Sequence, residues 1–132
     1  MNTKEQAEQL IQSACNYYKI DRLRSERKKP FRIVKNKDNQ AVQVDALRMA
    51  MSYFLYKHFP LHMHEIGPMV GYSDHSTISY QYKKIDYYVQ VEDAKIYPYY
   101  LVIKDLAENL GINTERERVL VTKNNIFTRV NK

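Results

Sequence analysis

The residues with the clearest chemical potential form one stretch near the middle of the chain, Gly71 to Ile85. Short hydrogen-bonding side chains come first and cations follow: Asp74, His75, Ser76, Ser79, Tyr80, Lys83 and Lys84. Small polar groups at the start of a helix can approach base edges, and basic groups further along can neutralise phosphates. These residue types are therefore typical of a helix that lies in a groove of duplex DNA.

A helix over this stretch needs a second, apolar face to hold it against a core. Ile78, Tyr82 and Ile85 recur at i, i+4 and i+7, so they share one face. Gly71 provides the backbone freedom of a tight turn, and Ser73 or Asp74 can accept from the first free amides. An ordinary amphipathic surface helix would show the same periodicity, so both interpretations stay open at this point.

Composition indicates one folded domain. The 132 residues are 44% hydrophobic and 27% charged, with 3 Gly and 4 Pro and hence no evident linker. No apolar run reaches membrane-spanning length, and Met1 to Glu5 does not resemble a signal peptide. We therefore expect no membrane partner and a cytoplasmic location. The single cysteine, Cys15, lies on an apolar helical stripe and is expected in the core.

The positive charge is concentrated in one segment. The net charge is +6, and between Lys19 and Lys37 nine cations face only two acids, Asp21 and Glu26, a local excess of +7. A basic segment on a folded domain often follows a phosphate backbone. A solvated loop is the alternative. The expected DNA-binding basic loop, residues 27–37, has these cations: Arg27, Lys28, Lys29, Arg32, Lys35 and Lys37.

Apolar periodicity and capping residues predict a mainly α fold, a bundle of about six helices. The expected helices span residues 4–19, 21–26, 45–58, 62–70, 74–90 and 98–110. Asp21 and Asp45 are expected to cap the second and third helices, and Gly111 to end the last. In the third helix Leu47 and Phe54 belong to the apolar stripe, while Arg48 and Ser52 are expected to point away from it. Pro68 indicates either a kinked fourth helix or one that begins late.

Two further segments are β-prone. Residues 31–44 have apolar runs around a polar Asn/Asp-rich centre, which predicts a hairpin, with a disordered basic loop as the alternative. Residues 111–132 form a C-terminal extension with two short β-prone runs. The extension could be a second hairpin or a disordered or dimerising arm.

Several motifs occur together and in order. They are Tyr17-Tyr18-Lys19-Ile20, Arg48-Met49-Ala50-Met51, Met63-His64-Glu65-Ile66-Gly67, Gly71-Tyr72-Ser73-Asp74-His75-Ser76-Thr77 and Lys83-Lys84-Ile85. Over residues 5–110 the chain resembles the C-terminal DNA-binding domain of the DnaA family of bacterial replication initiators. The family's hallmark is Gly-Gly-Arg-Asp-His-Thr-Thr, followed by Arg/Lys-Lys-Ile. The resemblance implies a Trp-repressor-like helix-turn-helix domain, residues 1–110, that binds double-stranded DNA in replication initiation, its regulation or transcription regulation.

The resemblance also implies roles for individual residues. Asp74, His75 and Ser76 would contact base edges in the major groove, with Ser79 one turn further along. Thr77 would contact phosphate or support the turn, and Lys84 would contact phosphate. Arg27, Lys28 and Lys29 begin the loop from which the family sends an arginine into the minor groove. The remaining candidates for backbone contacts are Tyr80, Lys83 and Arg48.

The chain departs from the family at several positions. Ser73 replaces the arginine before Asp-His, Tyr72 replaces the second glycine, and Asp45-Ala46-Leu47 replaces Arg-Pro-Arg. The basic loop is about ten residues longer. We therefore expect a target other than the family's usual site. No Gly-x-x-x-x-Gly-Lys-Ser/Thr phosphate loop is present, so we expect no nucleotide and a reader of DNA without an ATPase.

An enzyme or metal site and a protein-interaction module are the alternative classes of function. His58, His62, His64 and Glu65 are close in sequence, but His62 and His64 would diverge on a helix and no cysteine or aspartate completes a set. No catalytic arrangement is visible, so we expect no enzyme, metal or cofactor. A protein-interaction module with the same fold, binding a replication or regulatory protein, is the alternative function. The 12 tyrosines would suit an interface or a core short of phenylalanine.

Overall fold

A computed structural model describes residues 2–23, 33–71 and 76–115, with all their side chains except those of 33–34 and 76–81. In these ranges the chain is mainly α-helical, as predicted, with one two-stranded antiparallel sheet. The elements in order are α1 (Thr3–Tyr18), β1 (Ile33–Lys35), β2 (Ala41–Gln43), α2 (Val44–His58), α3 (Met63–Met69), α4 (Ser76–Gln90) and α5 (Tyr97–Asn109). The predicted β-runs of the C-terminal extension lie outside the described residues.

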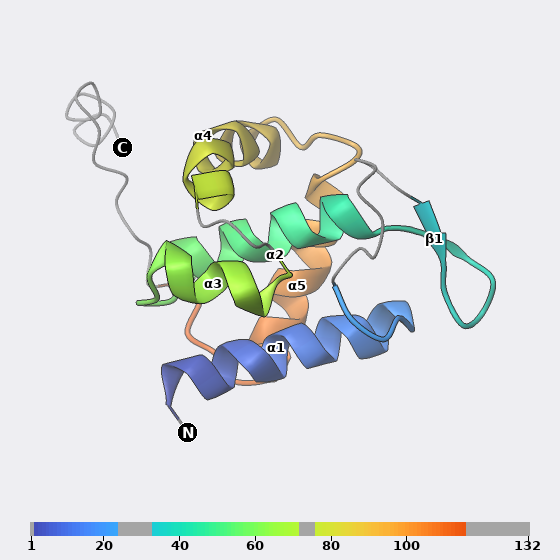
Figure 1. The fold of residues 1–132 in the computed structure, drawn as a ribbon, viewed down its shortest axis with the longest axis horizontal. Helices are drawn as coiled ribbons and strands as arrows, with labels where there is room; N and C mark the ends of the chain where they lie inside the picture. The colour runs from blue at the N-terminus through green and yellow to red at the C-terminus, as the bar shows by residue number, and fades with distance from the viewer. Residues whose placement is uncertain (1, 24–32, 72–75, 116–132) are drawn as a thin grey trace.

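Helix α2 is the centre of the molecule. It packs against α3, α4 and α5, and in Figure 1 it runs between α1 on one side and α4 on the other. Its apolar stripe is fully buried, with Leu47, Met51, Phe54 and Leu55 all at 0% exposure. Because neighbours cover α2 on several sides, nearly every side chain along it is inside the protein.

The burial of α2 corrects one prediction. Arg48 and Ser52 were expected to point away from the core, yet they are 8% and 1% exposed. Ser52 is compatible with this burial because its hydroxyl donates to the Met49 carbonyl, 3.0 Å away. The polar positions of α2 face other elements of the protein, and sequence periodicity alone does not reveal where those elements lie.

Helix boundaries agree closely with the predictions, because local chemistry sets them. The side chain of Asn2 accepts from the Glu5 amide at the start of α1, and Lys19 adopts a left-handed conformation at its end. Pro98 lies in the first turn of α5, and Gly111 has a φ of +75° just after it. The predicted burial of Cys15 is confirmed at 2% exposure, and burial raises the pKa of its thiol.

Two capping predictions were wrong. Residues 21–23 are not helical, so the expected short helix does not start at Asp21, and residues 24–26 lie outside the described part. The carboxylate of Asp21 pairs with Lys37 instead, 3.1 Å from its Nζ. Helix α2 begins one residue before Asp45, which lies in its first turn and binds Arg48. Both carboxylates that were expected to cap a helix form ion pairs instead: Asp21 with Lys37, which is distant in sequence, and Asp45 with Arg48, one turn along the same helix.

Helix α3 has its proline near the end. Pro68 is the second-last residue of α3, so the helix neither starts late at Pro68 nor continues far beyond it. Pro68 has no amide hydrogen to donate to the His64 carbonyl four residues earlier, and the helix ends one residue later. Ile66 and Val70 are fully buried, which confirms the predicted inward positions.

Candidate nucleic-acid interface

Helix α4 has one buried face and one exposed face over its described side chains. Tyr82 and Ile85 are 3% and 1% exposed, which confirms them as core residues. The Tyr82 ring contacts the rings of Tyr53 and Tyr56 on α2, at centroid distances of 5.0 and 4.7 Å. Lys83 and Lys84 are exposed, so two adjacent cations of α4 are directed to solvent.

A hydrogen bond sets the rotation of α4 about its own axis. The hydroxyl of Tyr53 on α2 donates to Asp86 Oδ1 at 2.5 Å, and Gln90 Nε2 donates to Asp86 Oδ2 at 2.8 Å. Burial, the hydrogen bond and the charge of Asp86 together raise the pKa of Tyr53 well above its ordinary value. Asp86 is one residue after Ile85, so the bond holds the edge of the buried face and helps keep the lysines outside.

The residues expected to contact bases are only partly within the described structure. Asp74 and His75 lie outside the described residues. Ser76, Thr77, Ser79 and Tyr80 belong to α4, and their side chains are outside the described part. The expected recognition helix, 74–90, thus corresponds to α4 from Ser76 onward, with the same last residue.

Arg48 has a different environment from the one predicted for a phosphate contact. Its Nε donates to the Val70 carbonyl at 3.1 Å, one terminal nitrogen donates to the Gly71 carbonyl at 3.0 Å, and the other binds Asp45 Oδ1 at 3.0 Å. Val70 and Gly71 directly follow α3. The arginine therefore joins the start of α2 to the connection between α3 and α4, and its guanidinium is directed into the protein.

The basic loop is described only at its ends. Arg27, Lys28, Lys29 and Arg32 lie outside the described residues. Lys35 is exposed on β1, and Lys37 is exposed while paired with Asp21. Lys19 likewise pairs with Asp38. Two cations of the basic segment thus have acidic neighbours, although exposed pairs of this kind contribute little to stability.

The hairpin predicted over residues 31–44 is confirmed over its described part, with Val34 on β1 opposite Val42 on β2. Its tip is built around Asn36, whose side-chain oxygen accepts from the amides of Asp38 and Gln40, both at 2.9 Å. Asn39 adopts a left-handed φ of +62°. The Asn/Asp-rich centre noted in the sequence is therefore an internally bonded turn.

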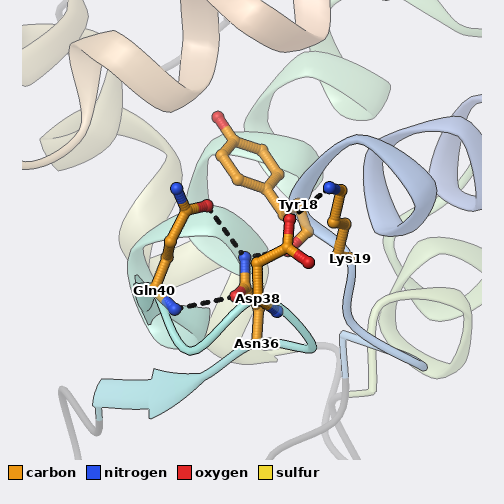
Figure 2. A network of polar contacts seen from close by, with 5 residues as sticks. All are labelled: Tyr18, Lys19, Asn36, Asp38 and Gln40. Atoms are coloured by element: carbon orange, nitrogen blue, oxygen red, sulfur yellow. Dashed lines mark hydrogen bonds and ion pairs between the residues drawn. The ribbon is translucent and has the colours of Figure 1, made fainter.

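The hairpin tip also contacts the end of α1. Asn36 Nδ2 donates to the Tyr18 carbonyl at 2.8 Å, and the Lys37 amide donates to the Lys19 carbonyl at 3.1 Å. Figure 2 shows Tyr18, Lys19, Asn36, Asp38 and Gln40 gathered at this junction. Because carbonyls at a helix end lack helical donors, the hairpin completes the C-terminus of α1. The junction brings residues 19 and 37, the two ends of the basic segment, together.

The histidines near α3 do not form a metal site within the described residues. His62 and His64 are exposed and stack, with centroids 5.3 Å apart and planes 9° apart. The expected divergence of the two rings was therefore wrong, because His62 is the N-cap residue and lies before the helix. Glu65 accepts from the His62 amide at 3.1 Å, and His58 is buried with its ring 4.5 Å from that of Phe54. Across the described ranges no group of three or more His, Cys, Asp or Glu side chains is placed to hold a metal ion.

Three contacts that position this region were not predicted from the sequence. The Tyr53–Asp86 bond joins residues 33 apart, and the bonds of Arg48 to Val70 and Gly71 span 22 and 23 residues. No local pattern indicates such pairs. The role of Asn36 had a detectable signal, because asparagine commonly bonds to amides of its own turn.

Comparison with known proteins found no match to any protein-family model, curated protein or solved structure. Among the helices in the described ranges, none is both long and apolar enough to cross a lipid bilayer.

Proposed function

We propose that this protein binds double-stranded DNA with sequence preference. In this proposal α4 lies in the major groove, the residues from Asp74 to Ser79 contact base edges, and Lys83 and Lys84 contact phosphates. The basic loop, residues 27–37, lies along the DNA backbone or in the adjacent minor groove. No catalytic residue, metal, nucleotide or cofactor is involved.

The observation that carries the proposal is the two-faced character of α4. Tyr82 and Ile85 attach the helix to the core, while Lys83 and Lys84 between them are exposed. α3 contacts α4 and precedes it by a short connection, an order compatible with a helix-turn-helix unit. The net charge of +6 also favours a polyanionic partner.

The resemblance to the DnaA-type domain indicates the biological setting. We propose a role in replication initiation, its regulation or transcription regulation, in the cytoplasm and in association with the nucleoid. Because Ser73 and Tyr72 replace family residues, the target sequence is expected to differ from the family's usual one. Selection from a random duplex pool would identify it.

Titration of the selected duplex and a scrambled duplex at several salt concentrations tests the proposal. A plot of log K against log salt should have a slope of several units, because phosphate contacts release counterions. Lys84→Ala should lower affinity for both duplexes and reduce the slope by about one. Lys4→Ala is the matched control, since Lys4 is exposed on α1, on the other side of α2 from α4.

Absence of binding to any duplex would refute the proposal. Equal losses in Lys84→Ala and Lys4→Ala would refute a DNA contact by α4, because the effect would then depend on net charge alone. Equal affinity for the selected and scrambled duplexes would reduce the function to non-specific binding.

A protein-interaction module is the second candidate function. Tyr87 near the end of α4 and Val91 directly after the helix are 61% and 52% exposed. Exposed apolar side chains of this size are a feature of protein interfaces. A replication or regulatory protein would be the partner, and binding to such a partner without binding to duplexes would favour this function.

A further inference from the structure

The strongest unexplained feature of the molecule is an arginine on α2 with almost no access to solvent. The Arg48 side chain is 10% exposed and that of its partner Asp45 is 18% exposed. Removing a charge from water is costly unless partners replace the water. Asp45 neutralises the guanidinium, and the carbonyls of Val70 and Gly71 accept two of its other donors. The guanidinium is therefore bound by one carboxylate and two backbone carbonyls of the protein itself.

The geometry requires arginine in particular. Three different nitrogens of one planar group reach three acceptors, and two of these acceptors are consecutive carbonyls. A lysine ammonium keeps the charge but is a single point on a flexible stem, so it does not present donors in this fixed fork. Arg48→Lys therefore tests the hydrogen-bond geometry of this site separately from its charge, because it changes the geometry and preserves the charge.

The two carbonyls lie at the exit of α3. The amides of Val70 and Gly71 donate back to Ile66 and Pro68 at the helix end, and Gly71 has a φ of +88°. The carbonyls of the same two residues lie beyond the end of α3 and accept hydrogen bonds from Arg48. Helix ends carry partial negative charge, so a cation there is also favourable electrostatically. Arg48 thus determines the direction in which the chain leaves α3.

Ser76, the first residue of α4, follows Gly71 by only five positions. We therefore expect a change in the path of the chain at Gly71 to shift the start of α4 relative to α2. The C-terminal half of α4 has independent attachments, namely Tyr82, Ile85 and the Asp86 hydrogen bond. The N-terminal end, where sequence preference would arise, is joined along the chain to Val70 and Gly71, whose carbonyls bind Arg48.

We propose that Arg48 is a positioning residue for DNA recognition: it holds the α3–α4 connection so that the start of α4 meets the groove in one register. The inference rests on the proposed function and deepens it, since it replaces the predicted phosphate contact by an indirect role. Asp45 completes the site by holding the guanidinium in place.

The test compares Arg48→Lys with the wild-type protein and with Lys84→Ala. The first measurement needs no DNA: amide hydrogen exchange at residues 70–71 and in the first turn of α4 should accelerate about tenfold or more in Arg48→Lys, while α1 and α5 keep their rates. The second is titration of the selected and scrambled duplexes. Arg48→Lys should lower the affinity for the selected duplex about tenfold, which is the size of a lost base contact. The salt slope should not change.

Two results would overturn the inference. Unchanged exchange at residues 70–71 would show that the arginine does not hold the connection. The charge-removing variant Arg48→Gln tests the alternative: if it weakens binding to both duplexes equally and reduces the slope by about one, as expected for Lys84→Ala, Arg48 is a phosphate contact. If Arg48→Lys is too unstable, Asp45→Asn keeps the arginine and should give the same pattern with a smaller effect. Failure of wild-type protein to bind any duplex refutes the proposed function, a result distinct from both.

Discussion

Tyr53 and Arg48 show how single polar side chains of α2 organise the candidate interface. Tyr53 holds the C-terminal half of α4 through Asp86, and Arg48 holds the connection before α4 through two carbonyls. Both side chains are largely buried, and both partners belong to the α3–α4 part of the chain. The central helix thus positions the proposed DNA-binding helix by hydrogen bonds as well as by apolar packing.

Replacing Tyr53 by phenylalanine should destabilise the protein by about 1–3 kcal/mol, because it removes a hydrogen bond to a carboxylate and keeps the ring. Urea denaturation at pH 7 measures this change. Tyr87→Phe is the matched control, since Tyr87 is 61% exposed, and its stability should equal that of the wild type. Equal changes in the free energy of unfolding in the two variants would show that the Tyr53–Asp86 hydrogen bond does not stabilise the protein.

The same variant has an expected pH dependence. Burial and Asp86 raise the pKa of Tyr53 in the folded state above the value of about 10 for an unfolded chain. The unfolded state therefore loses this proton first, and wild-type stability should be intact below pH ~10 and fall as the pH rises further. Tyr53→Phe has no such proton to lose, so its stability should fall less steeply above pH ~10.

The hairpin and the end of α1 form a second organised unit at the scale of elements. A two-stranded hairpin alone is marginally stable in water. Here the Asn36 side chain bonds to amides within the turn and to the Tyr18 carbonyl, so the tip is joined to a helix (Figure 2). The junction closes the chain around the basic segment, which is consequently joined to the fold at both ends.

Asn36→Ala should open this junction. The Asp38 and Gln40 amides would lose their acceptor, so their hydrogen exchange should accelerate, and stability should fall by about 1–3 kcal/mol for the several bonds removed. Exchange measured by NMR, together with urea denaturation, checks both effects. Asn39→Gly is the control, because the φ of +62° at Asn39 suits glycine and its stability should change little. Unaltered exchange in Asn36→Ala would contradict this account of the hairpin.

At the scale of the whole molecule, stability depends on α2. Helices α3, α4 and α5 all pack on it (Figure 1), and Phe54 contacts the rings of His58, Phe59 and Tyr100. The core therefore extends across the helices as one cluster of buried side chains. Loss of packing at α2 should affect all of them together.

Phe54→Ala should cost about 3–5 kcal/mol, because it removes a fully buried ring and leaves a cavity between helices. A single cooperative shift in the urea midpoint, seen both by helix content and by tyrosine fluorescence, is the expected result. Leu101→Ala, at a side chain 44% exposed on α5, should change stability by less than about 0.5 kcal/mol. Comparable losses in the two variants would mean that α2 is not the centre of stability.

Local chemistry made much of this architecture predictable from sequence. Apolar periodicity identified the helices, Pro98 and Gly111 marked the limits of α5, and the polar centre between two β-prone runs identified the hairpin. These signals work because a helix face, a cap or a turn depends on residues within a few positions of one another. The burial of Tyr82 and Ile85 followed from the same spacing.

Only the tertiary structure decided what the polar residues of α2 do. Arg48 and Ser52 lie off the apolar stripe, and in an isolated helix that side would face water. The turn after α3 covers it instead and brings two carbonyls to the guanidinium from 22 and 23 residues away. Asp86 meets Tyr53 in the same way, across 33 residues. Periodicity shows which side of a helix is apolar, but the packing of the whole chain determines what lies against the other side.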